Sequence, residues 1–210
     1  MSNLTRNTWT TKRLKYLATI NDEALPENTD PDLEISYIDI GNVDSTGIAE
    51  APTTYRFENA PSRARRIVKN GDVIISTVRT YLQAIAPIEN PPLNLIVSTG
   101  FAVVRPMPNE LDMGFCKYAL RENSFLSEVE KRSVGVSYPA VNSSELGDIL
   151  IKTTSIETQR RIAAYLDRET AHIDTLIAAK KRLLVLMAEK RQALIARAVT
   201  RGLEGKVKLK

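Results

Sequence analysis

The chain of 210 residues is long enough for one domain of common size with an additional element. Hydrophobic residues make up 43% of it and charged residues 26%, a globular composition that argues against wholesale disorder. The single cysteine, Cys116, and single histidine, His172, exclude a disulfide framework and a Cys/His zinc site within one chain. We expect a cytoplasmic protein, because no apolar run could span a bilayer and residues 1–7 lack the apolar core of a signal peptide.

The net charge of +4 is unevenly distributed along the chain. Residues 1–154 carry 16 Lys and Arg against 19 Asp and Glu, whereas residues 155–210 carry 13 against 6. Within the first part, residues 16–55 hold nine acidic residues and no basic one, and residues 56–79 are mostly basic. A nucleic-acid partner is compatible with this pattern, although overall charge does not establish it.

Residues 1–154 are predicted to form a mixed α/β domain. Alternating or β-branched apolar segments between turn signals predict five strands, at residues 33–37, 73–78, 82–88, 95–104 and 148–151. Helical periodicity covers residues 112–131, with a break near Asn123. Residues 133–144 are rich in Gly, Ser and Pro, which predicts a loop.

One long helix is predicted after this domain. The pattern from Thr154 to Glu157 is that of a capping box, with Thr154 as the N-cap. No Gly or Pro follows until after Thr200, so the helix would have about 45 residues and a length of about 65–70 Å.

The long helix has an apolar stripe that needs a partner. Its predicted core positions are Ile173, Leu176, Leu183, Met187 and Leu194. Three of the eight heptad seam positions, Lys180, Lys190 and Arg197, carry cations, so we do not predict a long, uniform two-stranded coil. Self-association or docking to another chain is favoured, because the apolar stripe needs to be covered. The alternative is a helix that folds back on its own domain with a kink near residues 168–170.

No convincing active site is present, so we predict no catalytic residue and no metal ligand. Neither G-x-x-x-x-G-K-[ST] nor G-x-G-x-x-G occurs. The segment Asn90–Leu93 lacks the aromatic residue of the Asn-Pro-Pro-aromatic motif of adenine methyltransferases. Asp32 follows a proline as in some metal-dependent nucleases, but the only Glu-x-Lys lies in the tail, at residues 204–206.

Several segments, taken in chain order, resemble the specificity subunits of type I restriction–modification systems. The similar segments are Trp9–Ala18, Asn70–Leu82 ("GD-hydrophobic-S-x-x-R-x-Y-L"), Ser133–Pro139, Ile156–Asp167 ("E-x-Q-x-x-I-A-x-x-L-D"), His172–Ile177, Lys190–Ile195 and Ala198–Leu203. Each is weak alone, but the ordered set is specific. The usual proline before the helix is replaced by residues 152–154.

The resemblance implies a target-recognition domain at residues 1–153, a long helix at 154–201 for dimerisation and partner docking, and a tail at 202–210. Family members commonly hold two such domains and two helices, so the chain looks like a half-length form. The family reads DNA without chemistry of its own, so no cofactor is expected here. S-adenosylmethionine belongs to the methylation subunit, and ATP to a motor/nuclease subunit where one is present.

Dimerisation with antiparallel helices would rebuild the full architecture and read two inverted half-sites in double-stranded DNA. Candidate DNA-contacting residues are Arg63, Arg65, Arg66, Arg79, Tyr81, Lys131, Arg132, Ser137 and Tyr138. The competing interpretation is a solvated basic face for the arginines and a core position for Tyr138. The acidic residues 22–50 should face away from DNA.

Two other classes of function stay open. A truncated remnant could bind a methylation subunit, or a full-length specificity subunit, through its helix and regulate it without productive DNA reading. A stand-alone nuclease or adenine methyltransferase is the third hypothesis and would depend on Asp32 or Asn90.

Overall fold

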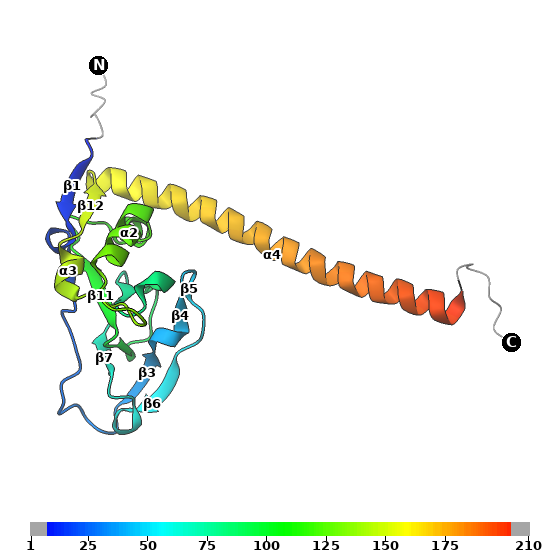
Figure 1. The fold of residues 1–210 in the computed structure, drawn as a ribbon, viewed down its shortest axis with the longest axis horizontal. Helices are drawn as coiled ribbons and strands as arrows, with labels where there is room; N and C mark the ends of the chain where they lie inside the picture. Colours follow the sequence, from blue (N-terminus) through cyan, green and yellow to red (C-terminus); the bar gives the residue numbers. More distant parts are fainter. Residues whose placement is uncertain (1–7, 203–210) are drawn as a thin grey trace, which may run out of the picture. The chain divides into compact units, whose positions relative to one another are not determined.

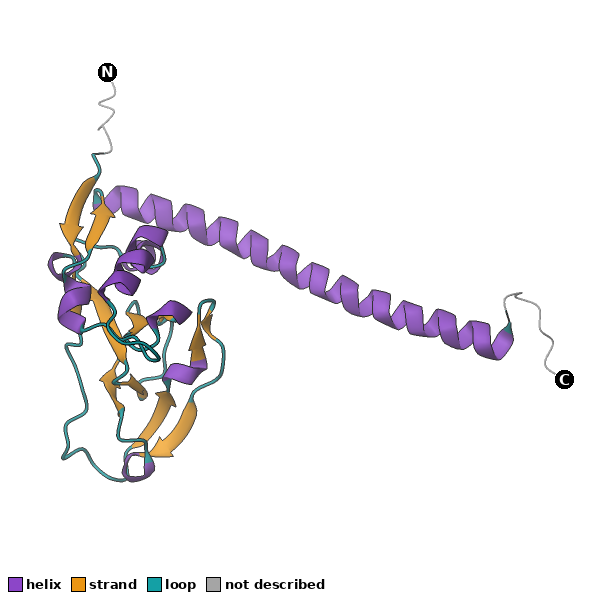
Figure 2. Cartoon of the chain, in the orientation of Figure 1, coloured by secondary structure: helices purple, strands orange, loops and turns teal. Residues whose placement is uncertain are grey.

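The computed structural model describes residues 8–202, which divide into two compact units between Ala163 and Ala164. Figure 1 shows the mixed α/β unit and the long helix, and Figure 2 distinguishes helices from strands. Our expectations for residues 1–7 and for most of the tail, 203–210, lie outside the described residues. No helix in the described range is long and apolar enough to cross a membrane.

The first unit contains two four-stranded sheets and two short strand pairs. One sheet has the order β6 (Thr53–Arg56), β3 (Glu34–Ile38), β10 (Leu95–Ser98) and β7 (Ala64–Ile67). The other has the order β2 (Ala18–Ile20), β11 (Phe101–Pro106), β8 (Val73–Ser76) and β9 (Ile85–Pro87). The pairs are β1 (Thr10–Arg13) with β12 (Leu150–Thr153), and β4 (Val43–Asp44) with β5 (Gly47–Ile48). Among the strand pairs within residues 8–202, β3 and β10 run parallel and the others run antiparallel.

The prediction of one strand over residues 95–104 is wrong, because the segment forms β10 and β11 in different sheets. The register slips between Val97 and Ser98, and the chain turns before β11. A Cβ atom at Gly100 would lie 2.2 Å from Cδ1 of Ile40, so a larger residue at this crossing would require the Ile40 side chain to move. A continuous apolar run thus concealed a change of sheet.

Other boundaries also differ from the sequence prediction. Residues 80–82 form a 3-10 helix, so β9 is shorter than the strand expected over 82–88. The loop expected at residues 133–144 ends earlier, because α3 begins at Ser143 (Ser143–Gly147). β6 and β7 were not predicted, since charged and polar side chains mask the strand pattern there.

The predicted break near Asn123 is confirmed, because α1 (Met113–Ala119) and α2 (Asn123–Arg132) are separate helices. The Asp112 carboxylate accepts a hydrogen bond from the backbone N–H of Phe115 at 3.1 Å and caps α1. Phe115, Phe125 and Val129 are buried in the core cluster that packs against the β2-β11-β8-β9 sheet. The two helices therefore cover an apolar sheet face.

Helix α4 runs from Ile156 to Arg201 as 46 residues, about 69 Å at the usual rise. It is one helix through residues 168–170, the predicted place for a kink. The predicted capping box is wrong. Ser155 precedes the first helical residue, and its hydroxyl oxygen accepts a hydrogen bond from the backbone N–H of Thr158 at 3.4 Å. A serine one position later supplies the cap instead of Thr154.

The start of α4 is fixed by Gln159, whose side chain is fully buried. Its amide oxygen accepts the backbone N–H of Asp112 at 2.8 Å. Its amide nitrogen lies 2.8 Å from both the Thr153 hydroxyl and the Thr154 carbonyl oxygen, and 3.2 Å from the Glu110 carbonyl oxygen. One side chain therefore joins β12, the loop before α1 and the first turn of α4.

We predict that Gln159→Leu lowers the free energy of unfolding by about 2–4 kcal/mol, because it leaves buried backbone groups such as the Asp112 N–H without a hydrogen-bond partner. Urea denaturation followed by circular dichroism would measure the change. Gln192→Leu on the exposed part of α4 is the matched control and should change stability by less than about 0.5 kcal/mol. Equal effects of the two variants would contradict the anchoring role.

Candidate nucleic-acid interface

Two segments far apart in the sequence lie against each other, and we call residues 77–83 and 133–140 the paired loops. The backbone N–H of Arg79 donates to the carbonyl oxygen of Pro139 at 2.8 Å, and that of Val141 to Thr77 at 3.0 Å. Val134 and Ala140 exchange hydrogen bonds of 2.9 and 3.0 Å, so the second loop closes as a short hairpin. Backbone bonds thus hold both loops at one place.

Hydroxyl groups add a second connection at the base of the paired loops. The Ser133 hydroxyl donates to the carbonyl oxygen of Val129 in α2 at 2.7 Å. The Thr80 hydroxyl lies 2.7 Å from the Ser133 oxygen. Since the only Ser133 hydroxyl proton goes to Val129, Thr80 is the donor in this pair. The Gln83 amide also donates to the Glu130 carboxylate at 3.0 Å, so α2 supports both loops.

Arg79 and Tyr138 form the centre of this surface. The Arg79 guanidinium carbon lies 4.6 Å from the centroid of the Tyr138 ring, a cation–π contact between the loops. Arg79 has a φ of 53° and Gln83 a φ of 50°, left-handed conformations that cost non-glycine residues about 1 kcal/mol or more each. The tight turn therefore holds Arg79 over Tyr138 at the expense of backbone strain.

Apolar side chains surround this pair and are open to solvent. Tyr138 is 60% exposed, Tyr81 55% and Val136 fully exposed, and Leu82 and Val134 are exposed as well. Tyr138 is therefore not a core residue. Leu82, Val134 and Val136 are not among the predicted DNA-contacting residues. For Val134 and Val136 the available signal was a large apolar residue within a Gly/Ser/Pro loop too short to cover it.

Lys131 and Arg132 end α2 close to the paired loops, and Ser137 is exposed within the second loop. Both cations pair with Glu128, at 3.0 Å for Lys131 and 3.4 Å for Arg132. The hydrogen bond from Lys131, with the charges of both cations, lowers the pKa of Glu128. A phosphate would have to compete with this carboxylate for the two cations.

The other three candidate arginines lie in or just before β7 and do not share one face. Arg63 lies 3.8 Å from an Asp39 carboxylate oxygen. Arg65 and Arg66 are neighbours in the strand, so they point to opposite sides of the sheet. The Arg65 guanidinium stacks 4.6 Å from the Phe57 ring centroid, and the Arg66 Nε is buried without a hydrogen-bond partner.

Several acids of residues 22–50 have partners within the first unit. Glu23 pairs with Lys69 and Arg105, the latter at 2.7 Å, and hydrogen bonding from Lys69 lowers the pKa of Glu23. Asp39 pairs with Arg63. These contacts give part of the acidic stretch a structural role.

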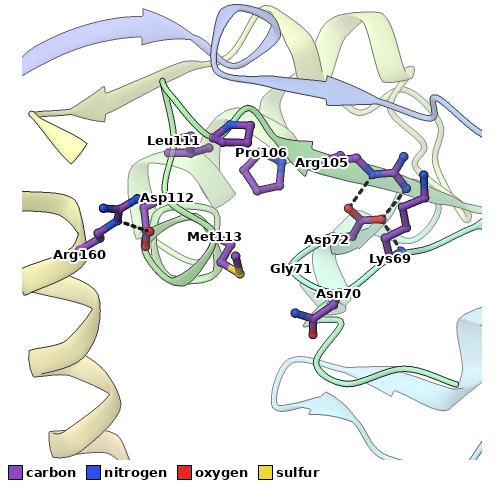
Figure 3. A pocket seen from close by; sticks show the side chains of 11 residues that line it. Lys69, Asn70, Gly71, Asp72, Arg105, Pro106, Leu111, Asp112, Met113 and Arg160 are labelled. Atoms are coloured by element: carbon purple, nitrogen blue, oxygen red, sulfur yellow. Dashed lines mark hydrogen bonds and ion pairs between the residues drawn. The ribbon is translucent and has the colours of Figure 1, made fainter. Parts of the chain in front are cut away.

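A pocket of about 320 Å³ lies apart from the paired loops (Figure 3). Its cations are neutralised: Arg105 makes two hydrogen bonds of 2.9 Å to Asp72, and Arg160 lies 3.4 Å from Asp112. The contact with Asp72 raises the pKa of Arg105. The two carboxylates that line the pocket, Asp72 and Asp112, are the partners of these arginines. We interpret it as a structural feature around the buried Asp72.

No group of three His, Cys, Asp or Glu residues within residues 8–202 is arranged to hold a metal ion. Cys116 is buried, and burial raises the pKa of its thiol, which disfavours the reactive thiolate. His172 is exposed on α4.

A second exposed surface lies on α4. All five predicted core positions of its apolar stripe are exposed in the single chain. Their exposed fractions run from 52% for Leu176 to 59% for Met187, so the helix presents a row of apolar side chains to solvent.

The family model of the type I restriction modification DNA specificity domain matches residues 6–184. The chain belongs to this family. Asp72, directly before β8, and Gln159 in α4 lie within the matched range, and both are buried. A search of curated proteins found no match.

Solved structures of specificity subunits show the same fold. The HsdS subunit from Thermoanaerobacter tengcongensis is 29% identical with a TM-score of 0.72, over 96% of this chain and 51% of that one. A chain from a structure of a type I R-M system, titled for its complex assembly and conformational transition, is 28% identical with a TM-score of 0.72, over 100% and 53%. The S subunit from M. genitalium, at 19% identity and TM-score 0.55 over 92% and 48%, shares the fold. The chain thus spans about half the length of these proteins.

We predict that Gly135→Ala disrupts the paired loops. Gly135 has a φ of +126°, and an added Cβ would lie 3.1 Å from the Tyr138 carbonyl oxygen. The amides of Val134 and Ala140 should then exchange hydrogen at least about tenfold faster, equivalent to about 1.4 kcal/mol. Mass-spectrometric hydrogen exchange would measure this. Gly41→Ala, where nothing lies within 4 Å of the added atom, is the control and should leave these amides unchanged.

Proposed function

We propose that this chain is the non-catalytic DNA-reading subunit of a type I restriction–modification methyltransferase. It would read inverted half-sites as a homodimer and recruit methylation subunits through its helices. The observation that carries the proposal is the surface of the paired loops in a specificity-family domain, where Arg79 stacks on Tyr138 and both Tyr81 and Ser137 are exposed. S-adenosylmethionine, and ATP where a motor/nuclease subunit is present, would bind the partner subunits.

The chemistry of the paired loops suits base recognition. An arginine can donate two hydrogen bonds to a guanine edge, and tyrosine and serine hydroxyls can bond to bases or phosphates. Exposed apolar groups such as Val136 can contact a thymine methyl group. Lys131 and Arg132 at the end of α2 would supply phosphate contacts beside the loops.

Two features support the homodimer. One is the exposed apolar stripe on α4, and the other is the position of α4 directly after the first unit in the chain. In an antiparallel pair, the N-terminal ends of the two helices lie at opposite ends of the pair, and each helix begins where its recognition domain ends. Two identical domains would then be held apart, as inverted half-sites with an unread spacer require. A parallel pair would place both domains at one end.

We predict that Leu176→Asp with Leu183→Asp converts the purified dimer to a monomer, because each change puts a charge into the apolar interface. Light scattering should give twice the chain mass for the wild type and the single-chain mass for the variant. Ala171→Asp with Ala178→Asp, at the same spacing on the other side of the helix, should stay dimeric. A wild-type chain that is monomeric even with the methylation subunit would contradict the homodimer.

We predict that Arg79→Gln weakens specific DNA binding by the complex with the methylation subunit about 10–100-fold, and that the loss is largest for one base of the site. Arg56→Gln, at an exposed arginine paired with Asp32, is the control and should have little effect. Fluorescence anisotropy with an inverted-repeat duplex selected by the wild-type complex would measure both. If the complex assembles but selects no defined site, the chain is a regulatory remnant instead.

A further inference from the structure

The exposed face of α4 has an uneven distribution of charge. Residues 164–174 carry three acidic residues and one arginine, whereas residues 190–201 carry four basic residues and no acidic one. Glu169, Leu176, Leu183 and Lys190 follow one another at intervals of seven, so they lie in one row that drifts by only about 20° per step. This row reads acid, leucine, leucine, base from its N-terminal to its C-terminal end.

When two copies of this row run in opposite directions, the acid of each copy faces the base of the other and the leucines face each other. We infer that two copies of α4 pair antiparallel with their two-fold axis near Lys180, and that Glu169 forms an ion pair with Lys190 of the partner subunit. This inference rests on the proposed homodimer and adds its register. By symmetry the ion pair occurs twice in each dimer, once on each side of the axis.

The same register also matches the apolar residues. It places Leu176 against Leu183 of the partner subunit and Ile173 against Met187 of the partner subunit. Leu166, half-buried in the single chain, would meet Leu194 of the partner subunit. All these contacts share the axis near Lys180, so one register satisfies the ion pairs and the apolar pairs together. The two Lys180 side chains can lie along the interface with their ammonium groups in water.

A parallel pair would lack this match. It would place Glu169 against its own copy, and Lys190 against its own copy, at interface positions where like charges repel. Within residues 8–202 of the single chain, the Glu169 carboxylate pairs with its neighbour Arg168 at 3.0 Å, and Lys190 has no ion pair. Both groups therefore remain available to a second copy.

The test is a charge exchange in the full-length chain, with the dimer dissociation constant measured by sedimentation equilibrium. Glu169→Lys and Lys190→Glu should each raise it about tenfold, because each change replaces two attractions by two repulsions. The exchanged chain, with both substitutions, should return to within about threefold of the wild type. An equimolar mixture of the two single variants should form a heterodimer of near wild-type affinity.

Two variants on the other side of α4 serve as controls. Glu189→Lys and Arg182→Glu make the same charge changes away from the apolar stripe and should leave the dissociation constant within about threefold of wild type. Circular dichroism should show equal helix content in all variants.

The outcomes separate the register from the proposed function. A wild-type dimer that is insensitive to both single substitutions, or an exchanged chain that stays as weak as the single variants, would overturn the ion pair and leave the homodimer standing. A wild-type chain that does not dimerise would overturn both. Weakening by each single variant and recovery in the exchanged chain would support the antiparallel register, since in a parallel pair each substitution replaces one like-charge pair by another and predicts no weakening.

Discussion

The position of the first turn of α4 within the first unit depends on the buried amide of Gln159. Its amide oxygen accepts a hydrogen bond from the backbone N–H of Asp112. Its amide nitrogen donates to the Thr153 hydroxyl and to the carbonyl oxygens of Thr154 and Glu110. A buried amide with all its partners in place tolerates little displacement, because each broken bond leaves a polar group away from water. The first turn of α4 is thereby fixed to β12 and to the loop before α1.

Asp72 has a comparable role within the sheets. It is almost fully buried, binds Arg105 through two hydrogen bonds and accepts the backbone N–H of Lys69. Gly71, with a φ of +88°, allows the turn that places this carboxylate. Asp72 thus fixes the turn before β8, and the same family-like segment continues into Arg79, Tyr81 and Leu82, so one stretch of chain joins the core of the sheet to the exposed paired loops.

The proposed function assigns DNA contact to the paired loops and dimerisation to the apolar stripe of α4. The paired loops combine a strained, stacked arginine with exposed tyrosine and valine side chains. Helix α4 offers an apolar stripe with complementary charges at its two ends. A reader of inverted half-sites needs both, because base contacts select the sequence and the helix pair would fix the distance between the half-sites.

The sequence by itself determined the long helix, the break between α1 and α2, and the family, because helical periodicity and local motifs are encoded over short stretches. Only the tertiary structure decided the division of residues 95–104 between two sheets, in which β10 pairs with β3 and β7 while β11 pairs with β2 and β8. It also decided that Arg79 meets Tyr138 and that Arg65 and Arg66 face opposite ways. These features depend on long-range backbone pairing, and no local pattern in a single sequence specifies which distant segments pair.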